Sequence, residues 1–129
     1  RIGDYTKNIY DLAVNHPNRL EAKSFENNLK EIEVNTLELL TSTIEAFKNQ
    51  DSSLASKLME DYKTEISSKC DEITNTIISS SDNELDTASS TAVALYSRYL
   101  KRISAHSRNL ISSIVNPFDR IGYPQKKSE

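Results

Sequence analysis

The fold is decided by residues 84–115, ELDTASSTAVALYSRYLKRISAHSRNLISSIV. This segment contains neither glycine nor proline, and apolar side chains recur along it at spacings of three and four. That period places them on one side of an α-helix, so we predict a single long helix that ends before Pro117. Its predicted core stripe comprises Leu85, Ala88, Ala92, Leu95, Tyr99, Ile103, His106, Leu110 and Ile114.

The helix-breaking residues lie near the two ends of the 129-residue chain. They are Gly3, Pro17, Pro117, Gly122 and Pro124. No glycine or proline lies between residues 18 and 116, so nothing there forces a helix to end. Proteins made of β-strands, in contrast, need glycine and proline turns at short intervals. The sequence therefore predicts an all-α protein built from a few long helices.

The same period of three and four recurs in three earlier segments, which predicts helices at 1–15, 24–49 and 53–78. Polar stretches separate them, and Ser24, Asp51 or Ser52, and Asp82 are the predicted N-caps. Because the loops are short, the last three helices are expected to form an antiparallel three-helix bundle. The residues expected in its core are Ile32, Ile44, Leu58, Ile66, Ile73, Leu95, Ile103 and Leu110.

The predicted organisation has three parts. Residues 1–16 form the end of the last helix of a preceding unit, residues 20–116 form the bundle, and residues 117–129 form a C-terminal tail. The first helix is expected either to dock on the bundle or to pair with another copy. The apolar tail residues Phe118, Ile121 and Tyr123 are expected to pack back on the end of the bundle.

Composition narrows the possible functions. A net charge of -3 supplies no general attraction for nucleic acid or anionic lipid. The single cysteine, Cys70, fits a cytoplasmic protein, and no segment is apolar enough to span a membrane. Cys70 has no base near it in the sequence, and two glycines cannot build a phosphate-binding loop. We therefore expect a binding protein and not an enzyme.

Two segments about a hundred residues apart are similar to each other. RIGDYTKNI at 1–9 and RISAHSRNL at 102–110 share Arg-Ile, a small third residue, an aromatic ring at the fifth position, and Asn before the final aliphatic residue. YSRYL at 96–100 precedes the second copy. This pair resembles the signature of the PhoU family, in which each of two tandem three-helix bundles has such a stretch on its third helix.

The resemblance implies a cytoplasmic regulator of phosphate uptake that contacts a phosphate transporter component or a sensor kinase. On that view the chain begins inside the last helix of a first bundle and contains the whole second one. Two alternatives stay open, namely the cytoplasmic PhoU-like domain of a sodium/phosphate cotransporter and a metal-binding helical bundle. A homodimer is also compatible with the sequence, and contact with a membrane is expected only through a partner or an upstream fusion.

The resemblance also implies a metal site made of carboxylates four residues apart. Asp4 in the first copy and Asp61 with Glu65 on the third helix match this pattern, but Lys101 and Ala105 occupy the acidic positions of the second copy. We therefore expect no multinuclear metal cluster and no cofactor in this bundle. Binding of iron, nickel or zinc is expected only in the intact protein. His106, on an apolar stripe, is expected in the core more than as a ligand.

Overall fold

The computed structural model of the chain describes residues 1–16, 22–79, 85–116 and 121–124, and every described element is helical. A short 3₁₀ turn and a π-helical segment accompany five α-helices. In chain order the elements are α1 (Ile2–Asn15), η1 (Lys23–Phe25), α2 (Glu26–Asn49), α3 (Ser52–Asp61), η2 (Tyr62–Ser67), α4 (Ser68–Ile78) and α5 (Thr87–Val115).

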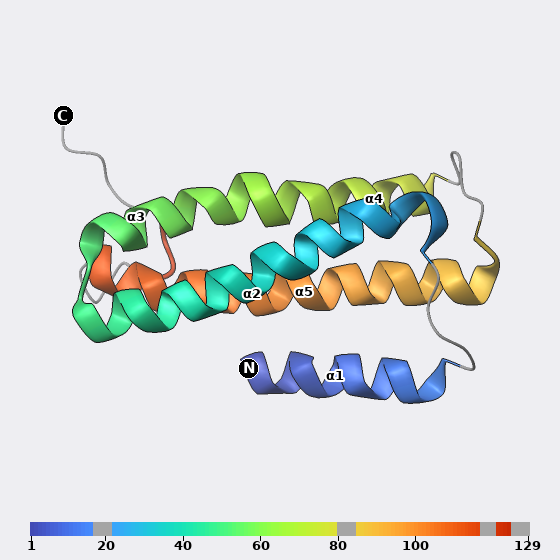
Figure 1. Ribbon diagram of the computed structural model, residues 1–129, viewed down its shortest axis with the longest axis horizontal. Coiled ribbons are helices and arrows are strands. Elements are labelled where there is room, and N and C mark those ends of the chain that lie inside the picture. The colour runs from blue at the N-terminus through green and yellow to red at the C-terminus, as the bar shows by residue number, and fades with distance from the viewer. Residues whose placement is uncertain (17–21, 80–84, 117–120, 125–129) are drawn as a thin grey trace.

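The helices α2, α3 to α4, and α5 form the predicted antiparallel bundle (Figure 1). The helix predicted at 53–78 is one rod in space, but η2 interrupts its α-helical hydrogen bonding at Tyr62–Ser67. The final helix starts at Thr87, later than predicted, because the Asp86 carboxylate accepts a hydrogen bond of 2.7 Å from the Ser89 N–H. The predicted cap Asp82 lies outside the described residues.

The other two predicted caps have different outcomes. Asp51 caps α3, because its side chain accepts a hydrogen bond of 3.0 Å from the Leu54 N–H. Ser24 does not cap α2, so that prediction was wrong. The Glu26 carboxylate instead accepts a hydrogen bond from the Ala22 N–H across the η1 turn, which satisfies a donor ahead of the helix in a different way.

Most of the expected core is confirmed. Ile32, Leu58, Ile66, Ile73 and Ile103 are all buried. All of them except Ile103 belong to an apolar cluster in which α2, α3, η2, α4 and α5 meet. The burial of this cluster is the main favourable contribution to folding.

Three expected core residues are on the surface. Ile44 is 51% exposed, Leu95 is 38% exposed and Leu110 is 51% exposed. The bundle face of α5 is rotated by one residue from the predicted stripe and is built largely from small side chains. It includes Ser90, Ala92, Val93, Ser97, Leu100, Ile103, Ser104, Ser107, Ile111 and Ser112.

Buried serines are tolerated on this face because their hydroxyls find acceptors. The Ser104 hydroxyl donates to the Leu100 carbonyl at 2.9 Å, and the Ser107 hydroxyl donates to the Ile103 carbonyl at 3.0 Å. Ser104 also lies 3.3 Å from the Thr36 hydroxyl of α2. Small side chains with satisfied hydroxyls let α5 sit at the centre of the bundle in contact with α2, α3 and α4.

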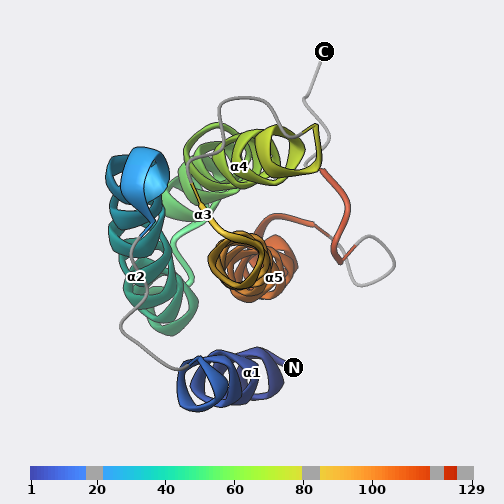
Figure 2. The same cartoon turned by 90° about the vertical axis from the view of Figure 1, so that its right-hand side faces the viewer.

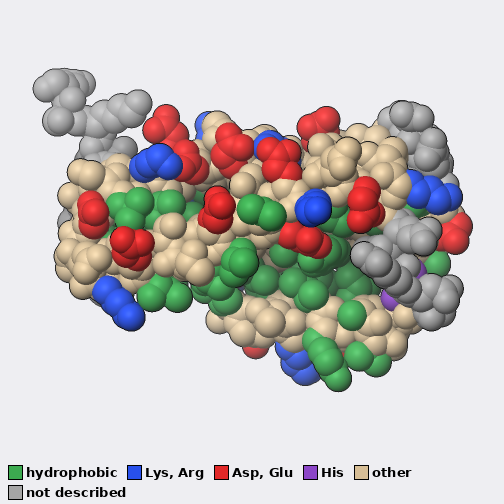
Figure 3. Space-filling model, viewed as in Figure 1, with side chains coloured by type: hydrophobic (Ala, Val, Ile, Leu, Met, Phe, Trp, Pro, Cys, Tyr) green, Lys and Arg blue, Asp and Glu red, His purple; other side chains and the backbone are tan. Residues whose placement is uncertain are grey.

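The first helix docks on α5, on the side away from α3 and α4 (Figure 2). It runs antiparallel to α5 (Figure 1), and Figure 3 shows apolar side chains gathered between α1 and the bundle. At the other end, the side chains of Ile121 and Tyr123 are 41% and 58% exposed, so the prediction that they pack back on the bundle was wrong. The tail is held to α5 by hydrogen bonds. The Arg108 guanidinium donates to the Gly122 carbonyl and the Asn116 amide donates to the Tyr123 carbonyl. Phe118 lies outside the described residues.

Candidate functional site

The predicted ligands Asp61 and Glu65 lie on the outer side of α3 and η2 and line a cleft against α2. The cleft has a volume of about 150 Å³, and Asn35 and Glu38 of α2 line its opposite wall. Because α1 lies on the far side of α5 (Figure 2), Asp4 is not brought to this cleft. The structure thus brings Asp61 and Glu65 together in one cleft and places Asp4 elsewhere.

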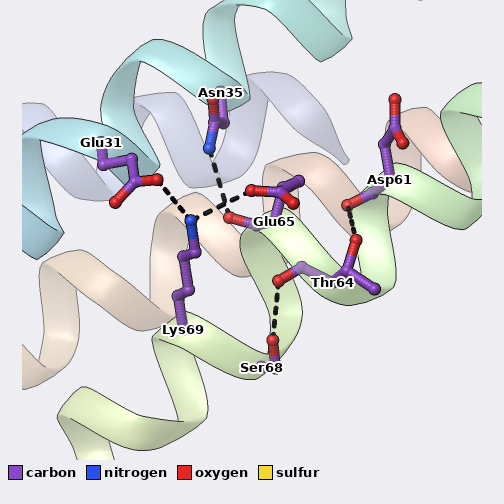
Figure 4. A network of polar contacts seen from close by, with 7 residues as sticks. All are labelled: Glu31, Asn35, Asp61, Thr64, Glu65, Ser68 and Lys69. Carbon is purple, nitrogen blue, oxygen red and sulfur yellow. Dashed lines mark hydrogen bonds and ion pairs between the residues drawn. The ribbon is translucent and has the colours of Figure 1, made fainter.

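Both carboxylates already have cationic partners one helical turn away. The Lys57 ammonium lies 2.9 Å from Asp61, and the Lys69 ammonium lies 3.0 Å from Glu65 (Figure 4). Lys69 also pairs with Glu31 across the gap to α2. Lys57 donates a hydrogen bond to Asp61, and Lys69 donates to Glu31 and Glu65; these bonds raise the pKa of each lysine above its ordinary value, so both ammonium groups are charged at neutral pH.

These pairs weigh against a divalent ion at Asp61 and Glu65. An ammonium group within hydrogen-bonding distance of each carboxylate repels a cation and occupies an oxygen that the cation would need. Among the described residues, no group of three or more His, Cys, Asp and Glu side chains is arranged to hold a metal. The exposed ion pairs themselves add little to stability.

Lys101 and Ala105, which occupy the acidic positions of the second signature copy, do not lie in this cleft. The Lys101 ammonium lies 2.6 Å from the Asp71 carboxylate, so it faces α4 and not the cleft beside α2. Ala105, one turn further along α5, is half-buried. Asp61 and Glu65 therefore do not face Lys101 and Ala105, as a family-type site on paired helices would require.

The π-helical segment η2 forms part of the cleft wall and has no sequence signal that we recognised. It contains Glu65, whose backbone carbonyl accepts a hydrogen bond of 3.4 Å from the Asn35 amide of α2 (Figure 4). Segments of π-helix are rare and occur often at functional sites. Here η2 begins directly after Asp61 and contains Glu65.

The two signature copies meet across the contact between α1 and α5. Tyr5 and His106, which occupy the same position in the two copies, stack with ring centroids 5.6 Å apart. The Arg102 guanidinium lies 5.7 Å from the centroid of the Tyr5 ring and donates to its hydroxyl at 3.4 Å. The repeated sequence therefore builds a helix interface.

His106 is half-buried in this interface. This placement agrees with the prediction that it packs in the core. Its Nε2 is buried and has no hydrogen-bond partner among the described residues. Burial lowers the pKa of His106, and the positive charges of Arg102 and Arg1 lower it further. The neutral imidazole is thus the favoured form in the folded chain.

Cys70 and the buried serines of α5 have a nucleophilic atom in the described core. Cys70 is buried, and burial raises the pKa of its thiol, which disfavours the reactive thiolate. The buried serines of α5 are bonded to backbone carbonyls, as at Ser104 and Ser107. No helix in the described ranges is both long enough and apolar enough to cross a lipid bilayer.

The fold defines a domain built as a bundle of long antiparallel helices. Comparison with protein families gives a match to the PhoU domain over residues 29–114, which spans α2 to α5. The chain belongs to the PhoU family, a family of regulators of phosphate uptake. No curated protein and no solved structure matches the chain.

Proposed function

We propose that the chain regulates phosphate uptake in the cytoplasm by binding a component of a phosphate transporter or a sensor kinase. The match of residues 29–114 to the PhoU domain is the observation that supports this proposal. The described residues are compatible with it, because they build a bundle of long helices with a long outer surface.

The geometry favours regulation by protein contact over a metal-dependent role for this bundle. Asp61 and Glu65 are paired with lysines, and Lys101 is engaged by Asp71. A regulator of this kind transmits its effect through differential affinity for two states of its partner. Phosphate itself is then sensed by the partner.

The test is a binding measurement with the purified chain. The phosphate transporter, solubilised in detergent, and the sensor kinase are purified from the organism that encodes the chain. The affinity of the chain for each is measured with and without inorganic phosphate. We expect saturable binding to one of them that changes with phosphate. The variant Ile66→Asp is the control, because a charge at this buried position unfolds the bundle and should abolish binding. Absence of binding to both proteins, with circular dichroism showing a folded chain, would overturn the proposal.

A further inference from the structure

The helix α1 is held less firmly than the helices of the bundle. None of its residues is fully buried, whereas each of the other α-helices buries two or more side chains. It packs mainly on α5 and lies apart from α3 and α4 (Figure 2). An element with few buried side chains opens locally at a low cost in free energy. The contacts between α1 and α5 therefore decide whether α1 stays docked.

The ring of His106 is part of this docking contact. It stacks on the Tyr5 ring of α1, with the centroids 5.6 Å apart and an angle of 24° between the planes. The Tyr5 ring also lies 6.3 Å from the ring of Tyr99, and its hydroxyl accepts a hydrogen bond of 3.4 Å from the Arg102 guanidinium. Of these four side chains, only His106 has an ordinary pKa that changes its charge between about pH 5 and 8.

The packing around His106 suits a neutral imidazole and not an imidazolium. Its Nε2 atom is buried and has no hydrogen-bond partner among the described residues. In the imidazolium both ring nitrogens carry a proton, so the buried Nε2 would become a donor without an acceptor. An unpaired buried donor is costly, and water could accept from it once α1 has moved away. The docked position of α1 is thus disfavoured when the ring is protonated.

Positive charges from both helices act on the same ring. After burial, the largest effects come from Arg102 of α5, then from Arg1 and the amino group at the start of α1, and all of them lower the pKa of His106. The helices α2, α3 and α4 pack on other sides of α5 (Figure 2) and provide none of these charges. Asp4, the nearest carboxylate of α1 in sequence to Tyr5, is exposed and is not among them either.

From this geometry we propose that α1 is a pH-dependent latch on α5: protonation of His106 releases α1 and uncovers the side of α5 that carries Tyr99 and His106. At neutral pH the uncharged ring stacks on Tyr5 and holds α1 in place. At mildly acidic pH the imidazolium lies beside the positive charges of Arg102 and Arg1, and its Nε2 proton lacks an acceptor. The latch goes beyond the proposed function, because it operates in the chain alone and needs no partner protein.

The direction of the effect follows from proton linkage. Released α1 leaves His106 in water, where it binds a proton more tightly than in the docked state, so a lower pH shifts the equilibrium toward release. Docking is strongest above the ordinary pKa of 6.5 and weakens as the pH falls below that value. Coupling between a bound ligand, here the proton, and a second equilibrium is typically about 5–150-fold. Such a factor is enough to matter for a helix without fully buried residues.

Hydrogen exchange of the backbone amides tests the latch in the whole chain. Exchange is measured at about pH 7.5 and about pH 5.5, on either side of the ordinary histidine pKa, and corrected for the intrinsic effect of pH on each amide. We expect the protection of residues 2–15 to fall at least about fivefold at the lower pH. The protection of the buried residues of α2, α4 and α5 should change much less. A loss confined to α1 separates release of the latch from unfolding of the bundle.

Substitutions at the two histidines assign the effect to one ring. His106→Phe keeps an aromatic ring against Tyr5 but cannot be protonated, so α1 should have the same protection at both pH values. The matched control is His16→Asn, because His16 is the other histidine of the chain and lies at the C-terminal end of α1. This variant should keep the pH response. His106→Arg has a permanent charge and should show low protection of α1 already at neutral pH. Circular dichroism checks that each variant folds.

A titration of the unmodified chain tests the latch without any substitution. The nuclear magnetic resonance signal of the His106 ring and the protection of α1 should change with the same midpoint. The proposal is overturned if α1 keeps its protection at the lower pH, if α1 and the bundle lose protection together, or if the two midpoints differ. It is also overturned if the response persists in His106→Phe or is lost in His16→Asn.

Discussion

Two isoleucines on the same helix should respond very differently to the same substitution. Ile32 is fully buried in the bundle core, whereas Ile44 is 51% exposed on the outer surface of α2. Replacing a buried isoleucine by alanine removes three carbon atoms, worth about 2.4 kcal/mol at about 0.8 kcal/mol each, and leaves a cavity that adds to the loss. We expect Ile32→Ala to reduce the free energy of unfolding by about 3–5 kcal/mol, and Ile44→Ala by about 1 kcal/mol.

Urea unfolding followed by circular dichroism measures both values. With a slope of about 1–3 kcal/mol per molar urea, the midpoint should fall by at least about 1 M for Ile32→Ala. Equal losses for the two variants would refute the assignment of the buried and exposed faces of α2.

Four further outcomes follow from the same contacts. Asp86→Ala should lower the melting temperature by removing the cap of α5, while Asp86→Asn keeps an acceptor and should lose much less. The native thiol of Cys70 should react with a thiol reagent only slowly until urea unfolds the chain, because burial raises its pKa. The pKa of His106 in the folded chain lies below its ordinary value of 6.5, so the unfolded chain binds more protons near that pH. The free energy of unfolding should therefore fall as the pH drops through 6.5. His106→Gln should remove this part of the loss. Elemental analysis after exposure to iron, nickel or zinc should find well under one ion per chain, and Asp61→Asn with Glu65→Gln should not change the result.

The all-α class, the number of long helices and most of their limits could be predicted from the sequence. They depend on where glycine and proline are absent and on a period of three and four, and both are local properties. The position of a helix start is less secure. Asp82 was the predicted cap, but α5 begins at Thr87 and the Asp86 carboxylate accepts the capping hydrogen bond from the Ser89 N–H.

The size of the side chains did not predict which face of α5 is buried in the bundle. The sequence offers two stripes one residue apart, and the stripe of larger residues includes Leu95, Tyr99 and Leu110. The central bundle instead buries the stripe with serines, because α5 contacts three neighbours and needs small side chains at the crossing points. The larger stripe lies on the side of α1, where Tyr99 contacts Tyr5.

The candidate site shows the same limit more sharply. A spacing of four indicates that Asp61 and Glu65 share a side of a helix, but it does not say which neighbour that side faces. In the structure they face α2, each beside a lysine on its own rod that is also four residues away. A carboxylate pair and a row of lysine–carboxylate pairs have the same spacing, so the neighbouring residues decide between a metal site and a solvated surface. Here Lys57 and Lys69 make these carboxylates part of an ion-paired surface next to α2.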